Sequence, residues 1–327
     1  MRFLASKTLA TVALAALCGL AAAPRHALAQ TFPSKPVRII YPFAPGGGME
    51  VATRVIAKEM QNSTGQPFVV ENRVGAGAAL AAQAVATAAA DGYTLFVGPV
   101  GIMAITPHLR KLPYDTLKDL QPIARLSQFR GVLVVSTQVP ANNVAEFIAY
   151  AKANPGKLSY GSAGVGSQGH VNSELLQQAW GIKLVHIPYK GAAEAATDLI
   201  SGRLDVYSDL TMLQYVKQGK AKLLAVYGDA RFPDFPDVPT LKEQRAPAMA
   251  ESETWFGAFA PRGTPPQVIE KLASEFEKAL RQPEVVASLQ SFMAQPAFLG
   301  PQAFGKLWEA DYARYGKAIA DAGIKVE

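Results

Sequence analysis

The sequence predicts an α/β protein with two lobes, each built from a mostly parallel sheet flanked by helices. Strand-like apolar runs alternate with helix-like segments along most of the chain, a pattern typical of sheets covered by helices. About 298 of the 327 residues remain once a predicted 29-residue export signal is removed, which is enough for two cores of ordinary size. Two stretches interrupt the alternation and are expected to cross between the lobes.

The chain begins with the pattern of a cleavable export signal. Arg2 and Lys7 precede an alanine-rich apolar run over residues 8–23, and small residues near Ala29 suit a signal peptidase. Cys18, the only cysteine, lies inside this signal, so the mature chain has no disulfide or reactive thiol. The run is shorter than the roughly 20 residues that span a bilayer. We therefore expect a signal peptide over residues 1–29 and a periplasmic protein without a membrane anchor.

The charge of the mature chain excludes one class of partner. The full chain has 32 basic and 26 acidic residues, a formal net charge of +6; loss of Arg2, Lys7 and Arg25 leaves 29 basic residues against 26 acidic ones, or +3. No basic cluster accompanies this mild excess, so no nucleic-acid partner is expected.

Each predicted element follows from its local pattern of apolar residues. In the first part of the chain, strands are predicted over residues 37–43, 67–73, 93–98 and 131–136, and helices over 50–61, 78–89 and 144–154. In the second part, strands are predicted over residues 158–164, 183–191, 204–210 and 222–228, and helices over 169–179 and 192–201. From residue 265 onward the pattern is purely helical.

The two expected crossings define the lobes. Residues 125–131 precede a fully apolar run, and residues 227–240 are rich in proline and aspartate, which disfavour both helix and central strand. Lobe 1 is therefore predicted to combine residues 30–131 with residues 227–327, and lobe 2 to span residues 132–226.

A glycine turn at the start of a helix predicts a first anion site. Gly46, Gly47 and Gly48 stand between a strand and a helix, where unpaired N–H groups and the helix dipole favour an anion. No Gly-Lys-Ser/Thr follows, so phosphate is not specifically indicated. The alternative is a tight turn that binds nothing.

A second glycine turn lies between residues 158 and 176. Its strand, Gly/Ser loop and helix repeat the first arrangement, and Ser162, Ser167 and Gln168 add hydrogen-bond donors. Two such turns facing each other could grip the two ends of an organic anion.

The second turn also matches a dinucleotide fingerprint, G-x-G-x-x-G, at Gly164, Gly166 and Gly169. That motif requires an acidic residue at the end of the next strand, where this chain has Lys190. Export would also separate the protein from the nicotinamide pool. No cofactor is expected.

The sequence provides no catalytic or metal-binding constellation. His170 and Glu174 are spaced as a pair on one helix face, but neither His108 nor His186 is spaced to complete a metal site. The nucleophile motif G-x-S-x-G does not occur.

Five further side chains allow two interpretations each. Arg130 and Lys190 are either carboxylate ligands or solvated cations, and Asp209 either orients a ligand or caps a helix. Trp255 and Phe256 either pack between the lobes or wall a cleft.

Taken in order, these stretches resemble the tripartite tricarboxylate transporter substrate-binding proteins, the Bug family. The likeness covers essentially the whole mature chain and rests on motifs such as "YPFAPGGGMEVATRVIA", "ADGYTLFVG", "LSYGSAGVGSQGHVNSELL", "HIPYKGAAEAATDLISGRLDVYSDL" and "TWFGAFAPRGTPPQVIEKL". It implies a type II-like periplasmic binding protein fold whose interlobe cleft captures a small carboxylate for a membrane permease. We also expect a monomer and no enzymatic activity.

The resemblance places the first ligand loop on residues 45–50 and the second on residues 162–170, with a contribution from Asp209. The full set of expected ligand residues is Pro45, Gly46, Gly47, Gly48, Met49, Pro99, Arg130, Ser162, Gly166, Ser167, Gln168, His170 and Asp209.

The chain departs from the family pattern at two places. Met49 and Glu50 stand where the family usually has Ser or Thr and then Asp, and Leu210 stands where Asn is common. Loss of a hydroxyl favours a less hydroxylated ligand, so we expect a dicarboxylate, aromatic ones included, rather than citrate. Backbone amides at both turns would suffice to bind it, leaving the arginine optional. A periplasmic sensor that feeds a membrane kinase, or an exported enzyme, are the alternatives.

Overall fold

The protein is described here by a computed structural model. It describes residues 32–46, 48–75, 79–189, 192–228, 230–245 and 254–325. Residues 35–327 form one compact unit, and all further description concerns that unit. The predicted signal peptide, Gly47 and Lys190 lie outside the described residues.

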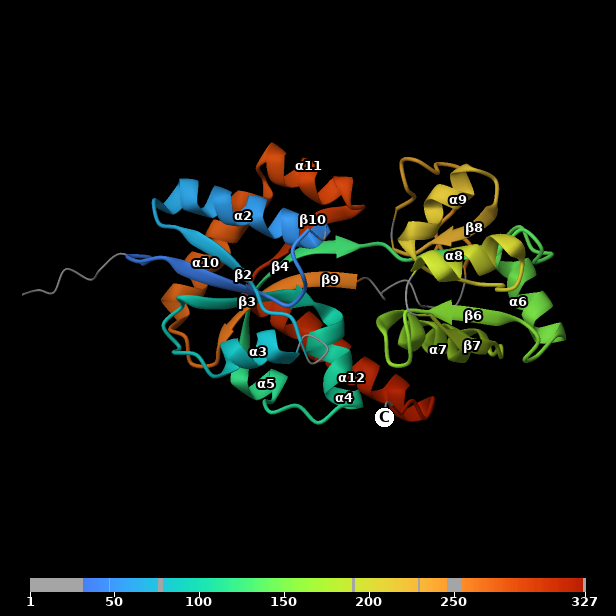
Figure 1. Cartoon of the computed structure of the whole chain (residues 1–327), viewed down its shortest axis with the longest axis horizontal. Helices are drawn as coiled ribbons and strands as arrows, with labels where there is room; N and C mark the ends of the chain where they lie inside the picture. The colour runs from blue at the N-terminus through green and yellow to red at the C-terminus, as the bar shows by residue number, and fades with distance from the viewer. Residues whose placement is uncertain are drawn as a thin grey trace, which may run out of the picture. The chain divides into compact units, whose positions relative to one another are not determined.

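The larger sheet contains six strands in the order β10-β4-β9-β3-β1-β2 (Figure 1). The pairs β1–β2 and β1–β3 are parallel, as the alternation of strands and helices predicts, whereas β3–β9, β4–β9 and β4–β10 are antiparallel. Its strands are β1 (Val37–Tyr41), β2 (Phe68–Asn72), β3 (Thr94–Pro99), β4 (Leu120–Phe129), β9 (Thr254–Pro261) and β10 (Ala294–Leu299).

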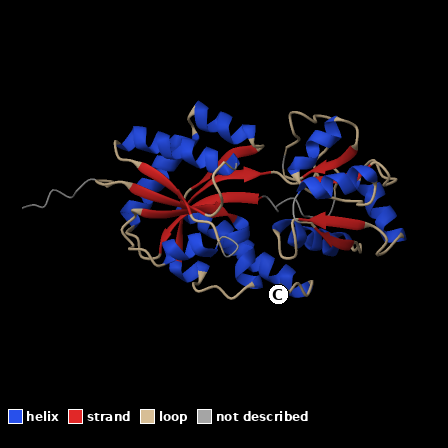
Figure 2. Cartoon of the chain, in the orientation of Figure 1, coloured by secondary structure: helices blue, strands red, loops and turns tan. Residues whose placement is uncertain are grey.

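Helices cover both faces of this sheet (Figures 1 and 2). α2 packs against α10 and α11 on one face, while α12 packs against β4 and a π-helical turn (Gly101–Ile105) on the other. These helices are α2 (Gly48–Thr64), α3 (Ala79–Ala86), α4 (Thr106–Leu109), α5 (Thr116–Asp119), α10 (Pro266–Leu280), α11 (Pro283–Ser291) and α12 (Pro301–Asp321).

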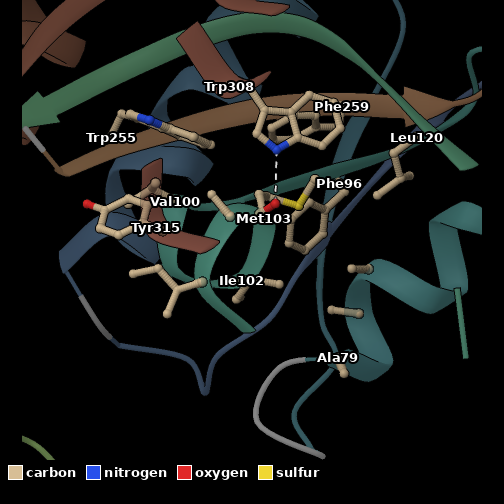
Figure 3. Close-up of a cluster of buried hydrophobic side chains, with 14 of the residues drawn as sticks. Ala79, Phe96, Val100, Ile102, Met103, Leu120, Trp255, Phe259, Trp308 and Tyr315 are labelled. Carbon is tan, nitrogen blue, oxygen red and sulfur yellow. Dashed lines mark hydrogen bonds between the residues drawn. The ribbon is translucent and has the colours of Figure 1, made fainter. Parts of the chain in front are cut away.

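An aromatic cluster fills the core between the sheet and α12 (Figure 3). Phe259 of β9 lies edge-on to the indole of Trp308, with ring centroids 4.9 Å apart. The indole Nε1–H donates to the main-chain oxygen of Met103 over 2.9 Å, so this buried polar group is satisfied.

Four shorter strands form the second group. β5 (Val132–Ser136) pairs with β8 (Ala221–Val226) antiparallel, and β6 (Ser159–Ser162) pairs with β7 (Val185–Pro188) parallel. Val206 forms single bridges to both β5 and β6 and so joins the two pairs. The surrounding helices are α6 (Val144–Ala153), α7 (Gln168–Trp180), α8 (Ala192–Ser201), a 3₁₀ turn (Leu210–Met212) and α9 (Leu213–Lys217).

The two segments that connect these groups are hydrogen-bonded to each other. The N–H of Tyr227, after β8, donates to the oxygen of Gly131, before β5, over 2.8 Å. A Cβ at Gly131 would lie 2.2 Å from the Tyr227 ring, so only glycine allows this close approach. The lobe boundaries predicted next to these two residues stay a proposal.

The structure corrects the sequence prediction in several places. Residues 125–129 of the first expected crossing belong to β4, and β9 was not among the predicted strands. The segment after residue 265 is not purely helical, because β10 intervenes between α11 and α12 and pairs with β4 at the edge of the sheet. Pro296 suits this edge position, since proline has no backbone N–H and cannot donate a hydrogen bond to a neighbouring strand. Residues 204–210 contribute only the Val206 bridges instead of a strand.

Among the described residues, no helix combines the length and apolar character needed to cross a membrane.

Candidate functional site

A cavity of about 390 Å³ lies among the ends of β4 and β9, the start of α7 and the segment before α9. Small-molecule pockets have volumes of roughly 300–1,000 Å³. Four expected ligand residues line the cavity: Arg130, Ser167, Gln168 and Asp209. The other lining residues are Phe129, Gly131, Val132, Ala163, Gly169, Asn172, Ser173, Ser208, Leu210, Tyr227, Thr254 and Phe256.

The start of α7 presents donors to this cavity. Ser167 caps the helix by accepting from the N–H of His170 over 3.3 Å, and the N–H of Gly166 donates to His170 Nδ1 over 3.0 Å. Among the described residues, no acceptor is found for the N–H of Gln168 or Gly169, and both residues line the cavity. Because α7 is 13 residues long, its dipole adds to the attraction that these N–H groups exert on an anion.

Behind the α7 loop, two histidines stack on each other. The rings of His170 and His186 are 4.0 Å apart and 8° from parallel, and Tyr160 stacks on His186 at 4.9 Å. Burial and the neighbouring His170 lower the pKa of His186 to about 4, and burial also lowers the pKa of His170. Ser162 Oγ lies 2.7 Å from His186 Nε2. Ser162, Gly166 and His170 therefore support the loop from behind and do not line the cavity.

Arg130 supplies a positive charge to the cavity wall. Among the described residues, its hydrogen-bond acceptors are all neutral: the main-chain oxygens of Ala230 and Arg231, both at 3.1 Å, and Oε1 of Gln295 at 3.0 Å. Since no described carboxylate neutralises this guanidinium, an anionic ligand in the cavity would meet an uncompensated cation.

Two further polar residues of the cavity, Asp209 and Asn172, differ in whether their side-chain oxygens already have hydrogen-bond partners. Asp209 Oδ1 accepts from both the N–H and the hydroxyl of Thr211, so it caps the 3₁₀ turn. Asn172 has a buried side-chain oxygen without a hydrogen-bond partner, and its residue lines the cavity. An unsatisfied buried acceptor is costly, and a ligand hydroxyl could donate to it, which makes Asn172 a candidate ligand residue that the sequence prediction missed.

An aromatic wall closes the side of the cavity formed by β4 and β9. Phe129 and Phe256 line it with ring centroids 6.0 Å apart, and Tyr41 stacks behind Phe256 at 6.5 Å. Trp255 points to the opposite face of β9, where its Nε1–H donates to Asp311 over 2.7 Å. Of the two aromatic residues in "TWFG", Phe256 walls the cavity and Trp255 packs in the core.

The described residues of the first glycine turn, Pro45, Gly46 and Gly48, do not line this cavity. Pro45 and Gly46 are exposed, and Gly46 has the positive φ of +91° that favours glycine. Gly48 is needed for packing, because a Cβ there would lie 2.2 Å from the ring of Phe292. Pro99 ends β3 opposite Phe256 and is also absent from the lining.

Two side chains of the first turn are directed elsewhere. Met49 is buried, with its sulfur 3.9 Å from the hydroxyl of Ser127. Glu50 turns back, and its Oε2 accepts from the N–H of Gly46 over 3.1 Å. The chain's own carboxylate thus occupies the helix start that was expected to hold the ligand.

Several lining residues carry a periodic signal in the sequence. Asn172 and Ser173 follow Gly169 by three and four residues and therefore share its helix face, and Thr254 and Phe256 alternate on one face of β9. Counting helical spacing from the second glycine turn would have identified Asn172 and Ser173 as lining residues.

Among the described residues, no group of three His, Cys, Asp or Glu side chains is arranged to hold a metal.

Comparisons with known proteins agree with this architecture. Residues 52–324 match the family described as "Tripartite tricarboxylate transporter family receptor" (TctC). Protein BugT of Bordetella pertussis (strain Tohama I) is 33% identical over 306 residues, which cover 91% of this chain and 93% of BugT.

Two similar structures have a ligand named with them. Rpa4515 of R. palustris, with adipate, is 33% identical, with a TM-score of 0.72 and coverage of 90% of this chain and 99% of that chain. MatC (Rpa3494) from Rhodopseudomonas palustris, with bound malate, is 32% identical, with a TM-score of 0.68 and coverage of 88% of this chain and 100% of that chain. The predicted family, the periplasmic binding protein fold and the expectation of a receptor instead of an enzyme are confirmed. The chain belongs to the tripartite tricarboxylate transporter receptor family, to which the Bug proteins also belong, and is a periplasmic solute-binding receptor.

Proposed function

We propose that the protein captures a small organic carboxylate, in the first place a dicarboxylate, in the cavity between Arg130 and the start of α7 and delivers it to a membrane permease. The observation that carries this proposal is a pairing within the described part of the chain: a guanidinium whose acceptors there are all neutral, and two N–H groups, of Gln168 and Gly169, for which no acceptor is found there. Both favour a carboxylate oxygen. The adipate and malate of the two R. palustris relatives are dicarboxylates of matching chemistry.

The available groups are sufficient for useful affinity. A hydrogen bond to a charged group contributes roughly 1.5–3 kcal/mol. Two bonds from Arg130 and two from Gln168 and Gly169 would give about 6–12 kcal/mol before ordering costs. Micromolar binding requires about 8 kcal/mol. Contacts with Phe129 and Phe256 would add apolar burial.

A bridging ligand would also favour closure of the cavity. Gln168 of α7 donates from its side-chain nitrogen to the hydroxyl of Thr254 at the start of β9 over 2.6 Å. A dicarboxylate held at both Arg130 and α7 would stabilise the same approach of the two groups of strands. Only such a difference in affinity can shift a conformational equilibrium.

Thermal melting with a panel of mono- and dicarboxylates tests the proposal. A ligand at a hundred times its Kd adds about 2.7 kcal/mol to the free energy of unfolding, which raises the Tm of a domain of this size by several degrees. Isothermal titration then gives the Kd of each acid that raises Tm. A panel in which no carboxylate raises Tm contradicts the proposal. Capture of permease subunits from solubilised membranes by the ligand-loaded receptor tests delivery.

A further inference from the structure

One side chain outside the ligand cavity holds the guanidinium of Arg130. Oε1 of Gln295, on β10, accepts from Nη2 of Arg130 over 3.0 Å. In the antiparallel pairing of β10 with β4, Ala294 lies opposite Phe129. Gln295 therefore lies diagonally across from Arg130, within reach of a long side chain. Since Gln295 is not among the residues that line the ligand cavity, its effect on a ligand there would act through Arg130.

The bonds to protein acceptors use only part of this guanidinium. Nη1 donates to the main-chain oxygens of Ala230 and Arg231, and Nη2 donates to Gln295. These bonds use at most three of the five N–H groups of an arginine. Among the described residues, Nε of Arg130 has no acceptor. Nε and Nη2 form one edge of the planar guanidinium, and such an edge can donate to both oxygens of a carboxylate.

The acceptor that Gln295 provides is an amide oxygen, which has no net charge. It can orient the guanidinium and still leave its positive charge to a ligand, whereas a carboxylate at the same place would neutralise that charge. Because a guanidinium only donates, the side-chain oxygen of Gln295, and not its nitrogen, must face Arg130. The ring of Phe232, with its centroid 6.0 Å from Cζ of Arg130, is a second uncharged contact.

Gln295 and Phe232 both line a second cavity, with a volume of about 430 Å³. Gln290, at the end of α11, lines the same cavity and is exposed. It is not among the hydrogen-bond acceptors of Arg130. The chain thus offers two glutamines beside one cavity, of which only Gln295 contacts the guanidinium.

Resting on the proposed function, we propose that Gln295 is a positioning residue for ligand binding. Its neutral oxygen orients Arg130 so that the edge formed by Nε and Nη2 meets a ligand carboxylate, and it leaves the positive charge available to that carboxylate. The two residues are far apart in the sequence, and the pairing of β10 with β4 brings them together.

Isothermal titration with adipate at pH 7.5 tests this role in two variants of Gln295. Gln295→Glu should raise the Kd at least about tenfold, because a carboxylate of the protein then competes with the ligand for Arg130. Gln295→Met, which removes the acceptor at similar length, should raise the Kd about threefold. Gln290→Glu makes the same change of charge beside the second cavity without contacting Arg130, and it should leave the Kd within about twofold of the wild-type value.

A double-mutant cycle separates positioning from a purely structural effect. In the Arg130→Gln background, Gln295→Met should leave the Kd for adipate unchanged within about 1.5-fold, because the guanidinium that Gln295 orients is absent. A structural effect of Gln295 on the cavity would raise the Kd equally in both backgrounds.

The outcomes separate failure of this inference from failure of the proposed function. A Kd of Gln295→Glu within twofold of the wild-type value, or an equal effect of Gln295→Met in both backgrounds, overturns the role of Gln295 while carboxylate binding stands. If the variants fail to fold, a crystal structure of the wild-type protein with adipate decides: the bond from Arg130 to Gln295 should persist beside the ligand, and its loss overturns the role. Absence of binding of succinate, glutarate, adipate and malate by the wild-type protein overturns the proposed function itself.

Discussion

At the scale of single residues, the structure gives Arg130 a more important role in ligand binding than the sequence predicts. The sequence alone predicts that backbone amides at two glycine turns suffice to bind the ligand, with the arginine optional. In the structure, the carboxylate of Glu50 accepts from the N–H of Gly46 in the first turn, and Arg130 lines the cavity with only neutral acceptors among the described residues. The sequence could not reveal this exchange, because it depends on how far one side chain reaches back along its own helix.

Replacing Arg130 is expected to weaken ligand binding strongly. Arg130→Gln removes the positive charge and the planar donors, and loss of even one charge-assisted hydrogen bond of about 1.5–3 kcal/mol would raise the Kd roughly 10- to 150-fold. Arg130→Lys should recover only part of the affinity, since a lysine cannot offer two parallel donors. Isothermal titration with adipate measures both. A Kd of Arg130→Gln within twofold of the wild-type value would contradict the role of Arg130.

Asn172 provides a second test at this scale. Its buried side-chain oxygen has no partner in the structure, so Asn172→Leu should not lower the free energy of unfolding by more than about 0.5 kcal/mol. The same variant should raise the Kd for malate, because the malate hydroxyl loses the Asn172 oxygen as an acceptor. Urea unfolding and titration give the two values. Loss of stability together with unchanged affinity would show that Asn172 is purely structural.

At the scale of elements, α7 serves both parts of the protein. Its first turn lines the cavity, and Val171, one turn later, is buried in the same core cluster as Trp255 and Trp308. The sequence predicted the helix and its glycine loop because both are local patterns. It could not predict that the helix packs against α12, since that contact joins segments more than 120 residues apart.

Val171→Ala is expected to lower both the free energy of unfolding and the affinity for adipate. Val171 is 0% exposed, and removing two buried methyl groups costs about 2 kcal/mol including the cavity left behind. The start of α7 would then be less firmly placed, so the Kd for adipate should rise. Leu80→Ala, at a position that is 43% exposed on α3, serves as the control and should change the free energy of unfolding by less than about 0.5 kcal/mol. Equal losses in the two variants would contradict this role of α7.

The histidine stack under the α7 loop predicts a dependence of stability on pH. The pKa of His186 is about 4 in the folded protein, against 6.5 for the ordinary group, so the folded state takes up its proton at lower pH than the unfolded state. Its contribution is therefore fully present above about pH 6.5 and is lost as the pH falls toward 4. Urea unfolding between pH 7.5 and 4.5 should show a smaller loss of stability for His186→Asn than for the wild-type protein. Identical slopes would contradict the assignment.

At the scale of the whole molecule, the sequence predicted the α/β class, and recurring motifs identified the family. The strand β10 was missed because its short sequence contains proline and little apolar alternation. The cavity could be predicted only in part. Arg130, Ser167, Gln168 and Asp209 were predicted because each belongs to a motif that can be recognised in its own stretch of sequence. Thr254 and Phe129 join them only through the antiparallel pairing of β4 with β9, which no local pattern specifies.

A crystal structure of the protein grown with adipate would show where the two carboxylates of the ligand bind. We expect one carboxylate within hydrogen-bond distance of the Arg130 guanidinium and the other accepting from the N–H groups of Gln168 and Gly169, with Glu50 still bound to Gly46. Adipate bound at the Gly46 turn in place of Glu50, with Arg130 still donating only to Ala230, Arg231 and Gln295, would contradict this expectation.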